Sequence, residues 1–336
     1  MSLWGATVIT NLLSAIPVFG PDLVELEVYK KLIVLIELDS LLQENLNSYS
    51  LASVLPTVGT ISPHAFKRGI KKRLDKSEYL NVPYQFIAYL VGLIDGDGYI
   101  PIIKTTKGYI KISLVIQLHL EDLSTLEYIN SVLKLGKITI NRDHKSPNCK
   151  LIINKTDLQD VFFPLMIHHG IFFLTDSRRS QFNLAMYILE NDIKQFLLIR
   201  DNLIDVLPPA FSELPENFLD YLNLKFFKNW VVGFTTAEGS FLLKINKDAC
   251  FQIKQRIHIN LFEAIKLLFL SNRKLTMEGD KYLQFSVSSK KDIQTVINFF
   301  SFSGLHPLTG LKNIQYFNWL NSLKNSNRYK SLNFPY

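Results

Sequence analysis

The chain has 336 residues, and its 47% hydrophobic content is enough to bury the cores of two ordinary domains, which excludes a chain that is disordered throughout. Its 37 Lys and Arg exceed its 30 Asp and Glu, and the net charge of +7 favours polyanionic partners such as nucleic acid or a membrane surface. Two isolated cysteines, Cys149 and Cys250, support neither a disulfide framework nor a thiolate zinc site.

The chain begins with a segment that carries no charged side chain over residues 1–21. It contains two prolines and lacks the basic start of a secretory signal, and the first arginine is Arg68, which argues against an Arg-rich import sequence. Apolar residues at helical spacing then predict an amphipathic helix over 22–47. The segment 48–76, which ends in the basic run KRGIKKR and a few further residues, is expected to be a solvated linker.

Regular patterns follow in the middle of the chain. The apolar run 84–97 predicts a buried helix whose uncharged stretch is too short to cross a bilayer. Period-two patterning predicts a strand over 109–117 and a hairpin formed by 137–141 and 150–154. Helical periodicity predicts further helices over 122–135, 158–166 and 184–198.

Three prolines within 206–217 indicate a connection between two lobes, after which the pattern restarts. The second series comprises a buried helix over 226–236, strands over 240–245 and 250–257, a helix over 261–270 and a hairpin over 274–288.

An internal repeat links the two series. The string LVGLIDGDGYI, Leu90–Ile100, aligns without gaps on VVGFTTAEGSF, Val231–Phe241, and puts Asp97 opposite Glu238. A single string of this kind often marks only a turn or a helix contact. Registered recurrence is what favours a functional site.

A second pair of strings follows the first at similar distance. LTDSRRSQF, Leu174–Phe182, matches LTGLKNIQY, Leu308–Tyr316, and puts Arg178 opposite Lys312. The order of acid and base therefore recurs in both halves of the chain.

Small residues recur four positions apart in both motif helices, as Gly92 and Gly96 in the first and Gly233 and Ala237 in the second. Helices that pack along these stripes would bring their C-terminal ends together, and with them the two motif acids. Two carboxylates and nearby helix carbonyls, here those of Gly96 and Ala237, favour hard divalent cations.

The glycine after each acid, Gly98 or Gly239, is predicted to end its helix through the left-handed conformation. Each acid then lies at a junction between a helix and a strand.

These two strings resemble the LAGLIDADG motifs of homing endonucleases and intron maturases, in the single-chain form with two motifs. The resemblance covers about residues 84–336, and its second motif has Thr235 and Thr236 where Ile and Asp are common. It implies an α+β fold of two pseudo-symmetric αββαββα lobes, with saddle-shaped antiparallel sheets around two packed motif helices.

The resemblance also implies roles for individual residues. Asp97 and Glu238 would bind Mg²⁺, or Mn²⁺, for hydrolysis of DNA phosphodiesters, each serving one strand. Arg178 and Lys312 would support the attacking water or the phosphate, and Gln255 would take a polar active-site position. Two correspondences stay open: Ser177 could replace Arg178, and the first-lobe counterpart of Gln255 falls near Leu120 or His119.

The first 26 residues resemble part of cytochrome b, which implies a reading frame that runs from a mitochondrial exon into its intron. We therefore expect a mitochondrial protein whose working form has no membrane role. The chain divides into an exon-like segment (1–26), a helix and basic linker (27–80), a first lobe (81–205), an inter-lobe linker (206–224) and a second lobe (225–336).

The expected partner is double-stranded DNA at an intron insertion site, bound by a monomer. Basic residues on or beside the predicted strands are expected to meet it. They are Lys104, Lys107, Lys111 and Arg142 in the first lobe, and Lys244, Lys247, Lys254 and Arg256 in the second.

Two other functions remain open. An RNA maturase would assist splicing of the host intron, with or without DNA cleavage, and would need a second basic surface for which Lys324, Arg328 and Lys330 are candidates. A DNA-binding regulator on the same scaffold would usually have lost one motif acid, whereas both are present here.

Overall fold

The computed structural model describes residues 74–143, 145–196 and 214–335. The exon-like segment 1–26, the predicted helix 22–47 and the linker up to residue 73 lie outside these ranges. Within the described ranges, no helix combines the length and the apolar character needed to cross a membrane.

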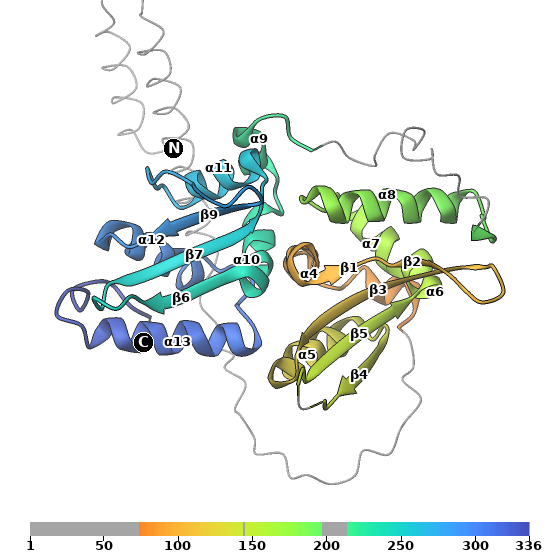
Figure 1. The fold of residues 1–336 in the computed structure, drawn as a ribbon, viewed down its shortest axis with the longest axis horizontal. Coiled ribbons are helices and arrows are strands. Elements are labelled where there is room, and N and C mark those ends of the chain that lie inside the picture. The colour runs from red at the N-terminus through yellow and green to blue at the C-terminus, as the bar shows by residue number, and fades with distance from the viewer. Residues whose placement is uncertain (1–73, 144, 197–213, 336) are drawn as a thin grey trace, which may run out of the picture. The chain divides into compact units, whose positions relative to one another are not determined.

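The first lobe contains one motif helix, an antiparallel sheet and further helices (Figure 1). Its elements are α3 (Lys76–Tyr79), α4 (Tyr84–Asp97), β1 (Gly98–Tyr99), β2 (Ile102–Lys104), β3 (Ile110–His119), the short helix η1 (Leu120–Asp122), α5 (Leu123–Leu133), β4 (Lys137–Asn141), β5 (Asn148–Asn154), α6 (Lys155–Asp157), η2 (Leu158–Phe162), α7 (Phe163–His168) and α8 (Asp176–Glu190).

The second lobe repeats this order with fewer small helices (Figure 1). Its elements are α9 (Phe218–Asn223), α10 (Phe227–Glu238), β6 (Gly239–Leu243), β7 (Ala249–Arg256), α11 (Ile259–Leu268), β8 (Thr276–Glu278), β9 (Tyr282–Val287), α12 (Lys290–Ser301) and α13 (Gly310–Lys324).

Both sheets are antiparallel and have the same topology. The strand order is β1-β3-β5-β4 in the first lobe, with β2 also paired to β3, and β6-β7-β9-β8 in the second. In each lobe a motif helix leads into a hairpin, a helix, a second hairpin and further helices. This order confirms the predicted α+β fold of two αββαββα lobes.

Strand alternation gives each sheet one apolar and one polar face. In β3, Ile112, Leu114 and Ile116 are buried on the apolar face. On the other face Lys111 and Gln117 are exposed near the ends of the strand, and Ser113 and Val115 between them are buried. In β7, Phe251 and Ile253 are buried in the same way. The helices α5, α11 and α12 contact the sheets and cover their apolar faces, which leaves the polar faces open.

The predicted hairpin 137–141 and 150–154 and the motif helices are confirmed almost to the residue, but one helix is placed wrongly. The expected helix 184–198 is α8, which begins at Asp176 and ends at Glu190. The apolar spacing after residue 184 identified only its second half, because the first turns are polar and face the motif helix.

Two further differences concern the segments that were expected to be linkers. The segment 206–224 contains α9, whose Tyr221 is buried and which packs on α11. The short helix α3 lies in the basic linker, and its Tyr79 is buried in the core. Buried aromatic residues therefore extend both lobes beyond their motif helices.

Candidate active site

The two motif helices, α4 and α10, touch backbone to backbone. A methyl group on Gly92 would lie 2.0 Å from the carbonyl oxygen of Trp230, and one on Gly233 would lie 1.8 Å from that of Tyr89. At Gly96 it would lie 2.3 Å from the Cβ of Ala237. Any larger side chain would push the helices apart, so the small-residue stripes fix how closely the two lobes approach.

The glycines after the acids are required for a reason other than the predicted one. Gly98 and Gly239 have φ values of −93° and −79°, so both are extended and neither is left-handed. A methyl group would lie 2.6 Å from Cγ2 of Ile94 at Gly98, and 2.5 Å from Cγ2 of Thr235 at Gly239. The chain turns so tightly from helix to strand that the last helical turn leaves no room for a Cβ.

Asp97 and Glu238 end the two helices and lie beside each other at the interface. A methyl group on Gly96 would be 3.5 Å from Oε1 of Glu238, so this carboxylate reaches the residue next to Asp97. Burial raises the pKa of Asp97 to about 6. Burial and then the charge of Asp97 raise the pKa of Glu238 to about 7. The fold thus crowds two acids against each other.

A basic side chain flanks the acids from each lobe. The Nε of Arg178 donates to the carbonyl of Ile94 over 3.2 Å, and the ammonium of Lys312 donates to the carbonyl of Gly239. The positive charges of Arg178 and Lys312 both act to lower the pKa values of Asp97 and Glu238, against the larger effect of burial.

The helix starts identify which residues of the second motif pair correspond. Thr175 precedes the first residue of α8 and Thr309 precedes the first residue of α13. Arg178 and Lys312 are therefore both the third residue of their helices, and Ser177 corresponds to Leu311. The open choice between Ser177 and Arg178 is settled in favour of Arg178 as the counterpart.

A glutamine side chain, Gln255, contacts the motif acid of the second lobe. Its Nε2 donates to Oε1 of Glu238 over 2.6 Å. Gly98 pairs with Ile116 and Gly239 pairs with Ile253, so the register makes Leu118 the counterpart of Gln255. The expectation of Leu120 or His119 is wrong, because the pairing of each strand with its neighbour places Leu118 at this position.

A family model described as LAGLIDADG endonuclease matches residues 90–169 and 231–323, more than half of the chain. The chain belongs to the LAGLIDADG family. The two matched ranges contain the two motif helices, and the structure packs these together.

Individual relatives agree with this assignment. A probable intron-encoded endonuclease aI3 from Dictyostelium discoideum is 25% identical over 71% of this chain and 95% of its own length. The structure of I-SmaMI bound to an uncleaved DNA target with calcium ions has a TM-score of 0.54 and 21% identity, covering 71% of this chain and 90% of that one. At this identity the likeness establishes the fold alone.

The N-terminus has a different relative. A stretch of 26 residues is 92% identical to cytochrome b of Strobilurus tenacellus. The match spans 7% of the length of that cytochrome b and supports the fusion of a short cytochrome b segment to this chain. Sequence and comparison agree on this fusion.

The first sheet of this LAGLIDADG protein presents rows of polar side chains on its open face. Strand pairing aligns Gln117 with Lys150 and Lys150 with Thr139, and it aligns His119 with Asn148. These residues are mostly uncharged, and alternation along the strands is the signal in the sequence that identifies them.

The second sheet has equivalent rows. Lys254 pairs with Gln284, which pairs with Thr276, and Arg256 pairs with Tyr282. The Lys254 ammonium forms an ion pair with Glu278 and lies 5.3 Å from the centre of the Tyr282 ring. Lys254 is therefore held in place on the open face.

The other basic residues predicted to meet nucleic acid are exposed and divide into three groups. Lys111 is on the open face, whereas Lys104 pairs with Ile110 and alternation puts it on the opposite face. The rest lie in or beside turns next to strands: Lys107, Arg142, Lys244 and Lys247.

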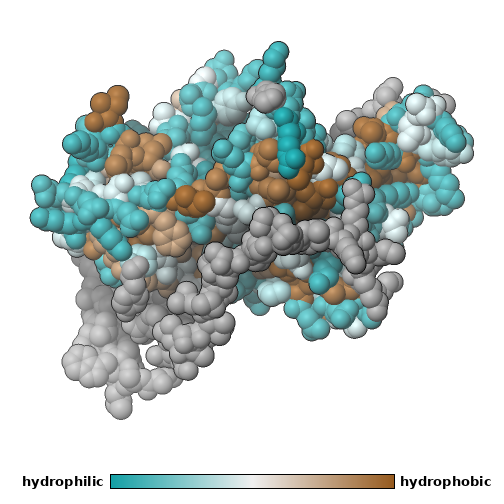
Figure 2. All heavy atoms as spheres, turned by 90° about the horizontal axis from the view of Figure 1, so that it is seen from below, coloured by the Kyte–Doolittle hydropathy of each residue, from teal (hydrophilic) through white to brown (hydrophobic). Residues whose placement is uncertain are grey.

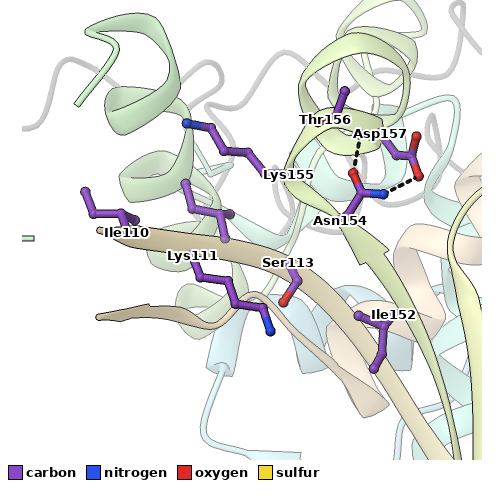
Figure 3. Close-up of a pocket in the computed structure, with 9 residues that line it drawn as sticks. Ile110, Lys111, Ser113, Ile152, Asn154, Lys155, Thr156 and Asp157 are labelled. Atoms are coloured by element: carbon purple, nitrogen blue, oxygen red, sulfur yellow. Dashed lines mark hydrogen bonds between the residues drawn. The ribbon is translucent and has the colours of Figure 1, made fainter. Parts of the chain in front are cut away.

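A hollow of about 490 Å³ lies at the outer end of the first sheet. Figure 3 shows Lys111 and Ser113 on one side of it and Asn154, Lys155 and Asp157 on another. Asn154 accepts from the backbone of Asp157 and donates to its side chain, which fixes this corner. Neither motif acid lines the hollow, so it extends the polar face rather than the site of the acids.

A second hollow, of about 520 Å³, lies between β6 and α13 and has mostly apolar lining, including Leu243, Ile314 and Trp319. The view from below in Figure 2 shows hydrophobic patches of this kind among hydrophilic side chains. Neither motif acid lines this second hollow.

Proposed function

We propose that this LAGLIDADG protein is a site-specific DNA endonuclease that hydrolyses one phosphodiester in each strand with the help of divalent cations, Mg²⁺ or Mn²⁺. The observation that carries the proposal is the meeting of Asp97 and Glu238 at the ends of two interlocked helices, with one cation from each lobe beside them. A DNA-binding regulator would have no need for such a costly pair of carboxylates.

The residues present fit a hard cation. The Asp97 side chain accepts no hydrogen bond from the part of the chain that the structure describes, although burial penalises its charge. Glu238 has a single amide donor in Gln255 and repulsion from Asp97. Carboxylate oxygens, with the carbonyls of Gly96 and Ala237 nearby, are the ligands that Mg²⁺ and Ca²⁺ take in proteins.

A bound divalent cation would supply an activated water and stabilise the leaving oxygen. The side chains of this chain would do the rest. Arg178 and Lys312 would stabilise charge on the phosphate, since each is held at a backbone carbonyl beside the acids. Gln255 would fix the orientation of Glu238 through its hydrogen bond.

The two open sheet faces would bind the DNA duplex. Two-stranded ribbons fit the major groove, where all four base pairs can be distinguished, and the polar rows described above offer donors and acceptors of both kinds. The lobes differ at almost every exposed strand position, so the target would be long and nearly asymmetric. Lys107, Lys244 and Lys247 in the turns would contact phosphates.

The intron insertion site in the cytochrome b gene would be the target, and the protein would act as a monomer in mitochondria. The cytochrome b match at the N-terminus and the intron-encoded relative support this assignment. The neighbour I-SmaMI is bound to DNA with calcium ions, which supports a DNA partner and a cation site.

The test is a cleavage assay of the full chain. The substrate is a duplex in which the cytochrome b coding sequence continues without the intron, and the control is the same duplex interrupted by the intron. With Mg²⁺ we expect a double-strand break in the first duplex alone. Binding with no cleavage in Mg²⁺ or Mn²⁺ would contradict the proposal.

Assistance to splicing of the host intron is a second proposed activity, favoured by the fusion to a cytochrome b exon segment. Of its candidate surface residues, Arg328 is paired with Asp248 and Lys324 donates to the carbonyl of Pro335. Lys330 is exposed. A splicing assay with the intron RNA tests this role: it requires faster exon ligation with the full chain, and a triple K324A/R328A/K330A variant that still cuts DNA should lose the effect.

A further inference from the structure

A carboxylate of the first lobe holds the start of the helix that carries Lys312 in the second. Asp122 ends η1, directly after β3, and its Oδ1 accepts the backbone N–H of Leu311 over 3.0 Å. The hydroxyl of Thr125 donates to the same oxygen over 2.8 Å. Leu311 immediately precedes Lys312, so this contact restrains the first turn of α13 where its basic residue leaves the helix.

The junction is closely fitted on the side of the second lobe. Gly310 has φ +54°, and a methyl group there would lie 1.7 Å from Oδ1 of Asp122 and 2.1 Å from Oγ1 of Thr125. The hydroxyl of Thr309 lies 2.5 Å from that of Tyr89 and 3.4 Å from that of Thr125. Only glycine fits both the backbone conformation and the space, so the contact is a built feature of the interface.

In the first lobe, the start of the corresponding helix α8 is held by a carboxylate of the same lobe. Asp95 of α4 accepts the backbone N–H groups of Leu174 and Thr175, over 2.8 and 3.2 Å, and the Thr175 hydroxyl over 2.5 Å. These bonds hold the start of α8, which carries Arg178. The repeat places Thr236 opposite Asp95, so α10 has no carboxylate at the position that holds the start of α8 in the first lobe.

We propose that Asp122 is a positioning residue for Lys312, and that through it the position of this second-lobe lysine depends on the first lobe. The inference rests on the proposed function. Asp122 follows β3, whose exposed side chains Lys111 and Gln117 face the open side of the first sheet. The lobe that carries these exposed strand residues therefore also holds the start of the helix that carries Lys312.

Loss of the Asp122 carboxylate would act on cleavage by displacing Lys312 from its position beside the acids. Without an acceptor, the N–H of Leu311 and the first turn of α13 shift to find another partner. A displacement of about 1 Å at a group that contacts reacting atoms can cost about 100-fold in rate. Arg178 keeps its own support from Asp95, so the two DNA strands should be affected unequally.

The experiment compares Asp122→Ala, Asp122→Asn and the matched control Glu121→Ala in the full chain. Glu121 is the exposed neighbouring acid, and the contacts of its side chain and backbone are with His119. The uninterrupted cytochrome b duplex is labelled on one strand or the other, and single-turnover rates are measured in Mg²⁺. DNA affinity is measured in Ca²⁺.

We expect Asp122→Ala to slow one strand by about 100-fold and the other by less than about threefold, with unchanged affinity. Asp122→Asn keeps an acceptor oxygen, and Asn is as effective as Asp at helix starts, so it should remain within about threefold on both strands. Glu121→Ala should match the wild type. Equal slowing of both strands by Asp122→Ala, or no slowing, would overturn the inference.

Hydrogen exchange separates this inference from the proposed function, because it needs no cleavage. Asp122→Ala should speed exchange at the start of α13 and leave the start of α8 unchanged, and Thr125→Val should do the same to a smaller extent if Asp122→Ala does not fold. Unchanged exchange in residues 310–314 would refute the capping role. If exchange differs between variant and wild type as expected but the wild type cuts no DNA, the capping role stands and the proposed endonuclease function is refuted.

Discussion

The two halves of the site have the same acid and base positions but different surroundings. In the second lobe Glu238 accepts a hydrogen bond from Gln255, whereas the register gives the first lobe Leu118, which is buried. The bases are arginine in one half and lysine in the other. Repetition has therefore preserved the groups that carry charge and changed those that orient them, which predicts two strand cuts of unequal rate.

The largest expected effect comes from replacing the motif acids, which both halves of the site contain. Asp97→Asn or Glu238→Gln should lower cleavage of at least one strand by about 1,000-fold, because a metal site supplies several kcal/mol of transition-state stabilisation and each 1.36 kcal/mol is tenfold. DNA affinity in Ca²⁺ should change little. Asp143→Asn, at an exposed acid in a loop, is the control, and undiminished cutting by both variants would disprove the role of the acids.

The helix interface should respond equally from either side. Gly92→Ala and Gly233→Ala each place a methyl group against a backbone carbonyl of the other helix, which cannot move as a flexible side chain can. Each should cost about 3 kcal/mol of the free energy of unfolding, the upper end for overpacking. Urea denaturation measures this, and a loss from only one of the two variants would show that the interface is not symmetrical.

The unequal amide positions give a third test. Gln255→Leu should slow cleavage about tenfold in the strand served by Glu238, since a hydrogen bond to a charged group contributes about 1.5 kcal/mol or more. Leu118→Gln should bring the two strand rates closer together. Nicked plasmid measured over time reports both effects, and the comparison fails if Gln255→Leu leaves the ratio of strand rates unchanged.

The smallest effect concerns a histidine with no equivalent in the first half. Burial lowers the pKa of His306 to about 4, and the ring stacks on Tyr89 at 3.9 Å and lies 2.9 Å from the Tyr128 hydroxyl. The repeat puts Phe172 at this position in the first lobe.

The unfolded chain takes up a proton at this histidine near pH 6.5 while the folded protein does not, so stability falls as the pH drops from about 6.5 towards 4. Between pH 7.5 and 5.5 the loss should be about 1 kcal/mol. His306→Phe should remove this part of the pH dependence, measured by urea denaturation, while substitution of the exposed His119 by Gln should leave it. An unchanged slope in His306→Phe would contradict the assignment.

The sequence predicted the elements whose patterns are local and strong. The motif helices, the hairpin over 137–141 and 150–154, and the meeting of Asp97 with Glu238 follow from apolar runs, period-two alternation and small-residue spacing. The remainder depended on contacts between distant parts. Leu118 is identified as the counterpart of Gln255 only by strand pairing, and nothing around Asp122 indicates that it reaches Leu311.

The motif sequences left two features unexplained: the physical reason for the glycine after each acid, and the role of Asp95. Gly98 and Gly239 are needed because the turn is crowded, which no single-residue preference reveals. Asp95, within the first motif, is buried and accepts a hydrogen bond from Trp230 of the other helix over 2.8 Å. Its partner in the repeat is Thr236, so the repeat gives no sign of this role. Asp95 is therefore a buried structural acid that accepts hydrogen bonds from the protein, unlike Asp97 two residues later.

A crystal structure of the full chain with its target DNA and Mn²⁺ would test the central claim most directly. Anomalous scattering locates the cations without reference to the protein. The account predicts at least one cation within about 2.5 Å of carboxylate oxygens from both residue 97 and residue 238, next to a phosphate of the duplex. Cations held elsewhere, with these two carboxylates bound to protein groups alone, would contradict it.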